Sequence, residues 1–425
     1  RQLKGYDWGE TTSRLFTFAP VSASKLRIQV RDLDGQQEGL PLYFRLTELE
    51  AYAPTDFIDI GRVIYVQVSS SETCTPSGIA ALHDNSDKTY AAEHAINGMY
   101  YDNLEHLGYA VPESFGLKNF KNTADIEINI LRWWQHRIFR NSGVSADGTE
   151  IYLDTDWLTS LQSTAYSDRI TWIENAYEFI DQPGEWYLNR SESKLYYKPD
   201  GSMDGKSATL PVTEQLLVFE GTENITFDGV KFEDTSWLTP NEIGYNDAQS
   251  GTYAQHNGVW GDVPGAIETH AAKNITITNS ELRNLGIGGI RIGNGSSDCA
   301  ITNSAIHDIS SSGIFIGNNT GHNHGYCDPG TDVTGVVVRN NYITRTGLDI
   351  FGSSAICALY TSDTVIDHNE VCYTTYTGIS LGWGWDWKNA PCSGNNTVSN
   401  NYIHDTGKTI HDGGSFYSIG LQEGT

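Results

Sequence analysis

The chain has 425 residues, which is enough for two or three domains and a large hydrophobic core. With 27 basic and 53 acidic residues its formal net charge is −26, which excludes nucleic acid and anionic membrane surfaces as favoured partners. No segment approaches the ~20 consecutive apolar residues of a membrane-spanning helix, and the 43 Gly, 11 Trp and 23 Tyr favour a β-rich protein with exposed aromatic rings and a neutral partner.

The N-terminal 55 residues contain two segments, 24–35 and 42–54, in which apolar and polar residues alternate. A period of two is typical of half-buried strands. The sequence from Leu46 to Tyr52 resembles the last strands of a discoidin-like β-sandwich. We therefore predict that residues 1–55 are the C-terminal part of such a domain. The alternative is a small strand cap on the domain that follows.

Residues 56–215 are predicted to hold the first strands of a β-helix together with a β-rich insertion. Strand patterns occupy 62–70, 124–139 and 150–154, and 89–98 could form one short helix. A hairpin is predicted over 184–201, because two apolar runs surround the polar turn Asn-Arg-Ser-Glu-Ser at 189–193.

From residue 216 to residue 425 one pattern repeats at intervals of 24 to 50 residues. Each copy ends in a core apolar residue, and a short apolar run follows, as in "GGIRIGN" and "SGIFIGN". Neither the register of a leucine-rich repeat nor the hairpins of a propeller are present. The fold class predicted is therefore all-β, a right-handed parallel β-helix of stacked coils. The six core positions are Phe232, Leu282, Ile306, Ile343, Val371 and Ile403.

Two equivalent positions in the repeats carry polar residues of interest. An Asn lies near several strand ends, and these Asn predict a stacked polar ladder at one corner of the coils. Two residues after each core position the side chain varies, and it is expected to face solvent. The ladder candidates are Asn279, Asn303, Asn340 and Asn400, and the variable positions are Asp234, Asn284, Asp308, Arg345, Tyr373 and Asp405.

Residues 404–414, "HDTGKTIHDGG", contain two His-Asp pairs seven residues apart. The loop between them could bring Asp405, at the end of one strand, towards Asp412, at the start of the next. Asp412 precedes Gly413 and Gly414 and then a strand expected to be buried, and glycines at such a point allow close backbone approach to a ligand. Glycosidases need a carboxylate pair of this kind. The alternative is that both are turn-forming aspartates, because Ile-His-Asp also occurs at 306–308.

Aromatic residues nearby could bind a sugar. In "GWGWDW", Trp383, Trp385 and Trp387 would share one side of an extended segment and could pack on the C–H faces of a sugar ring. The alternative is an aromatic stack over the edge of a coil. His256 and Trp260 lie in a polar insertion between coils that could fold over a groove, although a solvated loop is the alternative.

These segments resemble a known enzyme group. Residues 378–387 and 395–420, with the hairpin region 175–201, look like parallel β-helix glycoside hydrolases, and the Asp-x6-Asp spacing most resembles the lacto-N-biosidase family, glycoside hydrolase family 136. The resemblance implies a retaining β-glycosidase that releases lacto-N-biose from milk- or mucin-type glycans, with Asp405 as acid/base and Asp412 as nucleophile. A fucosidase- or xylanase-type glycosidase, a polysaccharide lyase and a non-catalytic glycan-binding adhesin are the alternatives. The substrate-binding candidates are Trp383, Trp385, Trp387, His404, His411, His256 and Trp260.

No cofactor and no metal are expected. The segment 318–332 bunches His322, His324, Asp328 and Asp332 and could bind a metal, but its loose Gly-rich spacing favours a loop bordering the cleft. The cysteines that could form disulfides, with no pairing readable from the sequence, are Cys327, Cys357, Cys372 and Cys392.

The expected partner is a neutral oligosaccharide, with no nucleic acid and no membrane insertion. An open solenoid end also predicts capping by further coils or by a second polypeptide. We expect a bacterial protein that is secreted or held at the cell surface.

Overall fold

The structure is a computed structural model that describes residues 99–102, 106–111, 113–131, 134–153, 171–254, 260–317, 332–384, 393–410 and 412–425. The predicted sandwich in 1–55, the strand in 62–70 and the helix in 89–98 lie outside these residues. Two compact units divide the described chain. One contains the residues up to 126 with 141–152 and 171–201, and the other contains 127–140 and the residues from 202 onward.

The first unit is built from short antiparallel strands. Strand β1 (Met99–Asp102) pairs with β2 (His106–Ala110), and β2 pairs with β5 (Glu150–Leu153), as the pattern in 150–154 predicts. The predicted hairpin is confirmed as β7 (Trp186–Asn189) and β8 (Lys194–Tyr197), with Trp186 opposite Tyr197. The remaining elements are η2 (Glu113–Phe115), η3 (Leu117–Asn119), η4 (Thr123–Asp125), β6 (Trp172–Glu174) and η7 (Tyr177–Phe179).

The second unit begins with antiparallel strands that precede and interrupt the coils. The segment predicted as strand at 124–139 forms β3 (Glu127–Leu131) and β4 (His136–Val144), which pair with each other. An insertion after the first coil contains the short helix α2 (Thr239–Ile243) and the strands β12 (Tyr245–Gln249), β13 (Thr252–Ala254) and β14 (Trp260–Asp262). Strand β12 joins β4 with Tyr245 opposite Ile138, so the insertion extends the β3–β4 pair.

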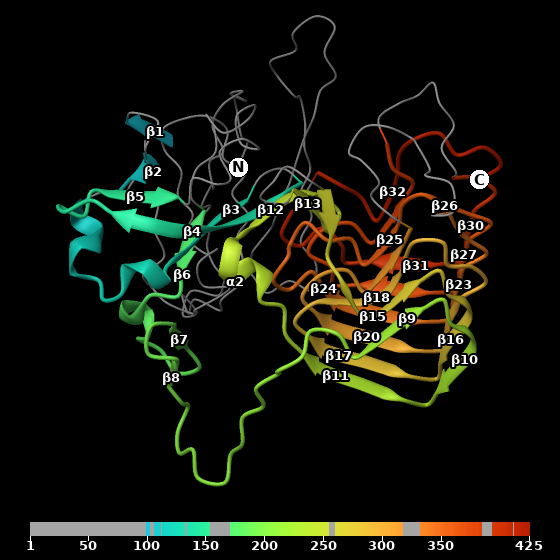
Figure 1. The fold of residues 1–425 in the computed structure, drawn as a ribbon, viewed down its shortest axis with the longest axis horizontal. Helices are drawn as coiled ribbons and strands as arrows, with labels where there is room; N and C mark the ends of the chain where they lie inside the picture. Colours follow the sequence, from blue (N-terminus) through green and yellow to red (C-terminus); the bar gives the residue numbers. More distant parts are fainter. Residues whose placement is uncertain are drawn as a thin grey trace, which may run out of the picture. The chain divides into compact units, whose positions relative to one another are not determined.

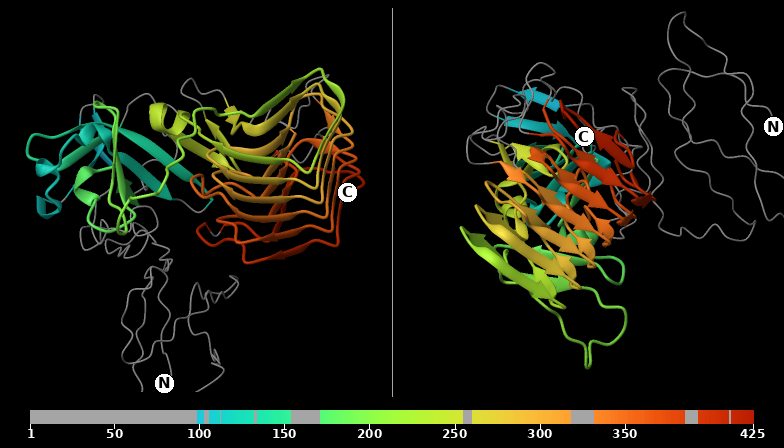
Figure 2. Two further views of the ribbon diagram at one scale, coloured as in Figure 1. Left: turned by 90° about the horizontal axis from the view of Figure 1, so that it is seen from below. Right: turned by 90° about the vertical axis from the view of Figure 1, so that its right-hand side faces the viewer.

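Three parallel sheets form the coils, which confirms the predicted parallel β-helix (Figure 1). Figure 2 shows the coils stacked in chain order, from yellow-green at β10 to red at β32. The first sheet contains β9 (Leu217–Glu220), β15 (Gly265–His270), β18 (Gly288–Ile292), β21 (Ile314–Ile316), β25 (Ile356–Ala358), β29 (Ile379–Leu381) and β32 (Phe416–Ser418). The second contains β10 (Glu223–Asp228), β16 (Lys273–Thr278), β19 (Ala300–Thr302), β23 (Val337–Arg339), β27 (Val365–Asp367) and β30 (Thr397–Ser399). The third contains β11 (Lys231–Thr235), β17 (Glu281–Leu285), β20 (Ala305–Ile309), β24 (Tyr342–Thr346), β28 (Glu370–Cys372) and β31 (Tyr402–His404). The pair β22 (Val333–Thr334) and β26 (Thr361–Ser362) makes a small parallel addition.

The six predicted core positions stack in register in the third sheet. Phe232 pairs with Leu282, and the row continues through Ile306, Ile343 and Val371 to Ile403. Most of these side chains are buried in one core with the inward residues of the other two sheets. The apolar spacing of the sequence therefore encodes the coil-to-coil alignment.

Two residues after each core position the backbone turns a corner in the left-handed region. All six variable positions have φ between 48° and 64°. Asn and Asp tolerate this conformation better than other non-Gly residues, which explains four of the six side chains. Asp405 therefore occupies a corner that the fold itself requires.

The predicted Asn ladder exists in part, with Asn340 Nδ2 donating to Asn303 Oδ1 at 2.8 Å, and a second, buried stack lies one residue later. The four predicted Asn adopt left-handed φ values of 50–54° at another corner, and the buried stack follows them. In that stack the Ser304 amide donates to Asn341 Oδ1 at 3.0 Å, the Asn341 amide to Asn369 Oδ1 at 3.1 Å and the Asn369 amide to Asn401 Oδ1 at 2.9 Å. The corner residue turns its side chain outward, so the next residue is the one that points inward.

Two cysteines and one strand differ from what the sequence predicts. Cys357 and Cys372 are free buried thiols, so neither forms one of the disulfides considered from the sequence. Strand β32, expected to be buried, has Phe416 46% exposed because β32 lies at the end of its sheet.

Among the described residues, no helix has the length and apolar character needed to cross a membrane.

Candidate active site

The carboxylate of Asp405 is solvent-accessible at the corner that follows β31, where its side chain is 39% exposed. Lys408 Nζ donates to Oδ1 at 2.7 Å, and His404 Nδ1 lies 2.9 Å from Oδ2. The contact with Lys408, and then that with His404, lowers the pKa of Asp405 below its usual value. At neutral pH this carboxylate is therefore ionised.

His404 connects Asp405 to a second carboxylate. Its Nε2 lies 3.5 Å from Glu370 Oε1, and Glu370 belongs to the preceding coil. The hydrogen bond to Asp405, with a smaller contribution from Glu370, raises the pKa of His404. The imidazole thus links two acidic side chains on the outer face of the third sheet.

Two exposed tyrosines lie beside this histidine. Tyr402 is 63% exposed and stacks on the imidazole with the ring centroids 4.4 Å apart. Tyr373 is 52% exposed, and its ring lies 6.1 Å from His404 and 5.9 Å from Lys408 Nζ. The sequence analysis placed Tyr373 among the solvent-side variable positions but selected neither tyrosine as a substrate contact. The signal was available, because Tyr402 directly precedes the core residue Ile403 and Tyr373 lies two residues after the core residue Val371.

Asp412 is exposed, and its backbone carbonyl accepts a 2.7 Å hydrogen bond from the Tyr376 hydroxyl. That hydroxyl in turn accepts from Gln249 Nε2 at 3.3 Å, and burial raises the pKa of Tyr376. A Cβ at Gly413 would lie 2.7 Å from Tyr376 Cε2 and against Thr377 Oγ1. The close backbone approach expected at this glycine is therefore made to the preceding coil of the protein itself.

A cavity of about 220 Å³ lies in the loop that joins the two aspartates. Thr406, next to Asp405, and Gly413, next to Asp412, both contribute to its wall. The remaining lining residues are Tyr376, Gly407, Ile410 and Gly414. Neither aspartate lines this cavity, although the residue after Asp405 and the residue after Asp412 both do, so the convergence of the two carboxylates stays a prediction.

Trp383 does not form a sugar platform. It is 2% exposed and packs with Phe315, Cys357 and Tyr360 in a small apolar cluster, so its role as a substrate contact was wrong. Left-handed glycines on both sides of it, Gly382 with φ 83° and Gly384 with φ 94°, break the extended geometry that the prediction assumed. Of the remaining substrate-binding candidates, Trp385, Trp387, His256 and His411 lie outside the described residues, and of Trp260 only the backbone, in β14, is described.

The arrangement around His404 occurs twice. Three coils before His404, His307 Nδ1 lies 2.7 Å from Asp308 Oδ2 and its Nε2 lies 3.2 Å from Glu281 Oε1. Arg345 binds Asp308 where Lys408 binds Asp405. The His-Asp pair is therefore in part a feature of the coil corner, as the sequence indicated. The exposed tyrosines and the adjacent cavity distinguish the second copy.

Comparison with known proteins identifies the fold. Residues 265–421 match the family model described as "Right handed beta helix region". A solved structure named "Glycoside hydrolase" is similar with a TM-score of 0.63 and 22% identity, covering 77% of this chain and 63% of its own length. Weaker similarity extends to XylC in complex with xylose, with 12% identity, a TM-score of 0.31 and coverage of 77% and 55%. It also extends to a tailspike protein of a Pseudomonas phage, with 12% identity, a TM-score of 0.29 and coverage of 73% and 42%.

No curated protein matches the chain. The chain spans about 63% of the length of the glycoside hydrolase structure. At 22% identity this similarity concerns the architecture. The coils of this protein accordingly form a right-handed parallel β-helix.

Proposed function

We propose that this protein is a glycoside hydrolase that cleaves a neutral oligosaccharide at the face carrying Asp405. The observation that carries the proposal is an ionised, exposed carboxylate next to a cavity, whose partner His404 lies against the exposed rings of Tyr402 and Tyr373. Tyrosine rings offer flat apolar surface for the C–H faces of a sugar and a hydroxyl for hydrogen bonds. The net charge of −26 favours a neutral glycan over a polyanion.

The proposed chemistry is retaining hydrolysis with Asp405 and Asp412 as the carboxylate pair. In such a reaction one carboxylate attacks the anomeric carbon while the other, as an acid, protonates the departing oxygen, and water then releases the sugar with that second residue acting as base. The resemblance assigns proton donation to Asp405. Lys408 and His404 lower the pKa of Asp405, which opposes proton donation, so we propose that bound substrate separates Asp405 from Lys408.

The finer proposal is that the enzyme releases lacto-N-biose from milk- or mucin-type glycans. It rests on the resemblance of the 405–412 spacing to the lacto-N-biosidase family. Incubation with a panel of aryl glycosides and milk-type oligosaccharides, with products separated by chromatography, tests this specificity. Preferential release of a fucose or a xylose unit instead would assign the protein to one of the other β-helix glycosidase types.

The decisive experiment compares Asp405→Asn and Asp412→Asn with the control Asp308→Asn. Asp308 occupies the same corner in another coil and makes the same kind of contact with its neighbouring histidine. Each site variant should reduce kcat at least about a thousandfold, as expected for loss of an essential acid, base or nucleophile. The control should retain activity. Full activity in either site variant would eliminate this carboxylate pair.

Azide separates the two roles. When azide replaces the nucleophile of a retaining enzyme, the product is a glycosyl azide of inverted configuration, and when it replaces the acid/base, the configuration is retained. Small variants, Asp405→Ala and Asp412→Ala, leave room for the anion. Inverted azide from Asp405→Ala would exchange the two assignments.

A second candidate function is glycan binding without catalysis. The His-Asp-Glu contacts recur at His307, Asp308 and Glu281, outside the proposed site. This repetition favours glycan binding without catalysis, because the contacts are then a feature of the fold and need no catalytic role. The adhesin alternative predicts glycan binding that Tyr402→Ala weakens, with no product released. A polysaccharide lyase would instead produce unsaturated sugars, seen as rising ultraviolet absorbance on a uronate polymer.

A further inference from the structure

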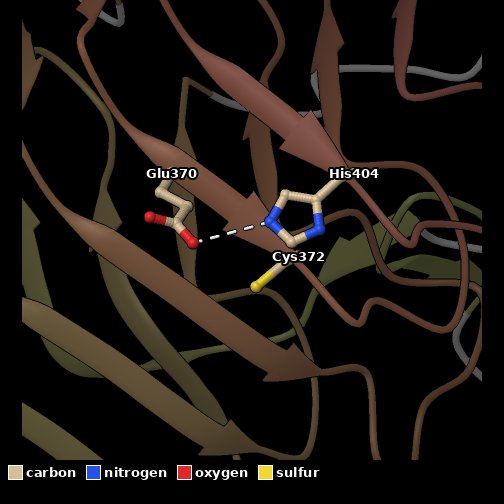
Figure 3. A group of neighbouring side chains, drawn as sticks. All are labelled: Glu370, Cys372 and His404. Atoms are coloured by element: carbon tan, nitrogen blue, oxygen red, sulfur yellow. Dashed lines mark hydrogen bonds and ion pairs between the residues drawn. The ribbon is translucent and has the colours of Figure 1, made fainter.

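Three side chains of different chemistry converge beside the proposed site. Glu370 and Cys372 lie on β28 and His404 lies on β31, and their ligand atoms are all within 4.8 Å of one another (Figure 3). Cys372 is directly opposite His404 in the parallel pair, and Glu370 is two residues before Cys372. Alternation along a strand places all three on the same outer face of the sheet.

This ligand set is chemically suited to zinc. Thiolate, imidazole and carboxylate all bind Zn²⁺, at about 2.3, 2.0 and 2.0–2.2 Å, so tetrahedral ligand atoms lie roughly 3.3–3.6 Å apart. The His404 Nε2–Glu370 Oε1 distance of 3.5 Å already fits this spacing, and all three ligand atoms lie within 4.8 Å of one another. The Cys372 side chain is buried, whereas the Glu370 side chain is exposed and flexible and can adjust to a bound ion.

The second contact of His404 independently favours metal binding. Its Nδ1 faces Asp405 Oδ2 at 2.9 Å, which leaves Nε2 directed at Glu370 and Cys372. Zinc-binding histidines characteristically donate their other ring N–H to a carboxylate, which fixes the tautomer and the ring orientation. Hydroxyls also surround the sulfur: Thr344 Oγ1 is 3.4 Å and the Tyr342 hydroxyl 3.8 Å from Cys372 Sγ. Both can donate hydrogen bonds to a thiolate.

The second copy of the arrangement supplies an internal control. His307 has the same Asp and Glu neighbours as His404, but its partner in the preceding coil is Arg283 instead of a cysteine. The Arg283 guanidinium binds Glu233 and approaches Glu281, so a positive charge fills the position that a metal would need. Of these two equivalent positions, only the one with Cys372 offers three metal ligands.

We propose that Glu370, Cys372 and His404 form a zinc site on the outer face of the third sheet. Three protein ligands leave the fourth tetrahedral position to water or to an oxygen of a ligand. The site borders Asp405, and it does not depend on the proposed glycosidase activity. It also goes beyond the sequence analysis, which expected no metal.

The test uses the full chain, freed of metal by a chelator and titrated with Zn²⁺ by calorimetry. Wild type should bind one equivalent more than Cys372→Ser. Glu370→Gln changes a side chain that is 47% exposed, and it should weaken this binding at least about tenfold. His307→Gln alters the equivalent histidine and should bind Zn²⁺ like the wild type.

Co²⁺ provides a second measurement. Wild type and His307→Gln should show a thiolate-to-cobalt charge-transfer band that is reduced in Cys372→Ser. The comparison between variants separates this site from metal bound elsewhere, for example by the His-rich segment 318–332. Equal stoichiometry in the wild type and Cys372→Ser, or unchanged affinity in Glu370→Gln, would overturn the proposal whatever the result of the hydrolysis assays.

Discussion

Replacing Asn369 by leucine should destabilise the β-helix at the corner that precedes the proposed site. Asn369 is 1% exposed, and its Oδ1 accepts from the Asn341 amide at 3.1 Å and from Asn341 Nδ2 at 2.9 Å. Its own Nδ2 donates to the Val338 carbonyl at 3.0 Å and to Asn401 Oδ1 at 2.9 Å. Leucine has a similar volume but can replace none of these bonds.

The expected loss of unfolding free energy is about 3 kcal/mol. A buried donor left without an acceptor costs roughly 1–3 kcal/mol, and the substitution removes the acceptor of two Asn341 donors. Because Asn341 Nδ2 also donates to the Ile301 carbonyl at 2.9 Å, this second donor keeps one partner. The amide of Asn341 therefore bears most of the cost, together with the carbonyl of Val338.

Urea unfolding followed by far-ultraviolet circular dichroism measures this loss. The double variant Asn341→Leu/Asn369→Leu measures the coupling between the two positions: it removes the Asn341 side-chain donor, but the backbone amide of residue 341 stays unpaired. Its destabilisation should therefore come close to the sum of the two single losses. A loss below about 1 kcal/mol for Asn369→Leu would refute the proposed role of the ladder.

Three further predictions concern charge and close packing. Lys408→Met should raise the pKa of Asp405, measured by ¹³C NMR of the carboxyl carbon, because Lys408 is the main cause of the low pKa. The stability that this carboxylate contributes above its unfolded pKa should then be lost at a higher pH as acid is added. An unchanged pKa in the variant would contradict the role of Lys408. Gly413→Ala should destabilise the loop, seen as a lower Tm, because its Cβ would lie 2.7 Å from the ring of Tyr376; a Tm equal to that of the wild type would show that the loop can move away. Burial raises the pKa of Asp247 from the ordinary value of 3.8 to about 8. Between these two pH values the native protein holds a proton on Asp247 that the unfolded chain has released, so stability should fall as pH rises from about 4 to about 8. Asp247→Asn should flatten that fall in urea unfolding measured at several pH values, and an equally steep fall in the variant would exclude Asp247 as its source.

The sequence determined the architecture of the coils. The spacing of Phe232, Leu282, Ile306 and the later core residues predicted which strands align, and the strand pairs confirm that register. It also located the corner residues, including Asp405, although their left-handed backbone was not expected. Such features are local: alternation fixes which side chains face the core, and a buried apolar row tolerates no shift by one residue.

Only the tertiary structure decided which side chains of the outer face are exposed and which of them lie side by side. Trp383 and Tyr402 are both aromatic residues close to a strand of the last full coil, yet one is 2% and the other 63% exposed. The pairing of Cys372 with His404 joins residues 32 positions apart, and its effect depends on which residue of the next coil lies opposite. Sequence periodicity specifies whether a side chain points inward or outward. What lies over an outward side chain, and what lies beside it on the next coil, follows from the lengths of the insertions and from the stacking of the coils.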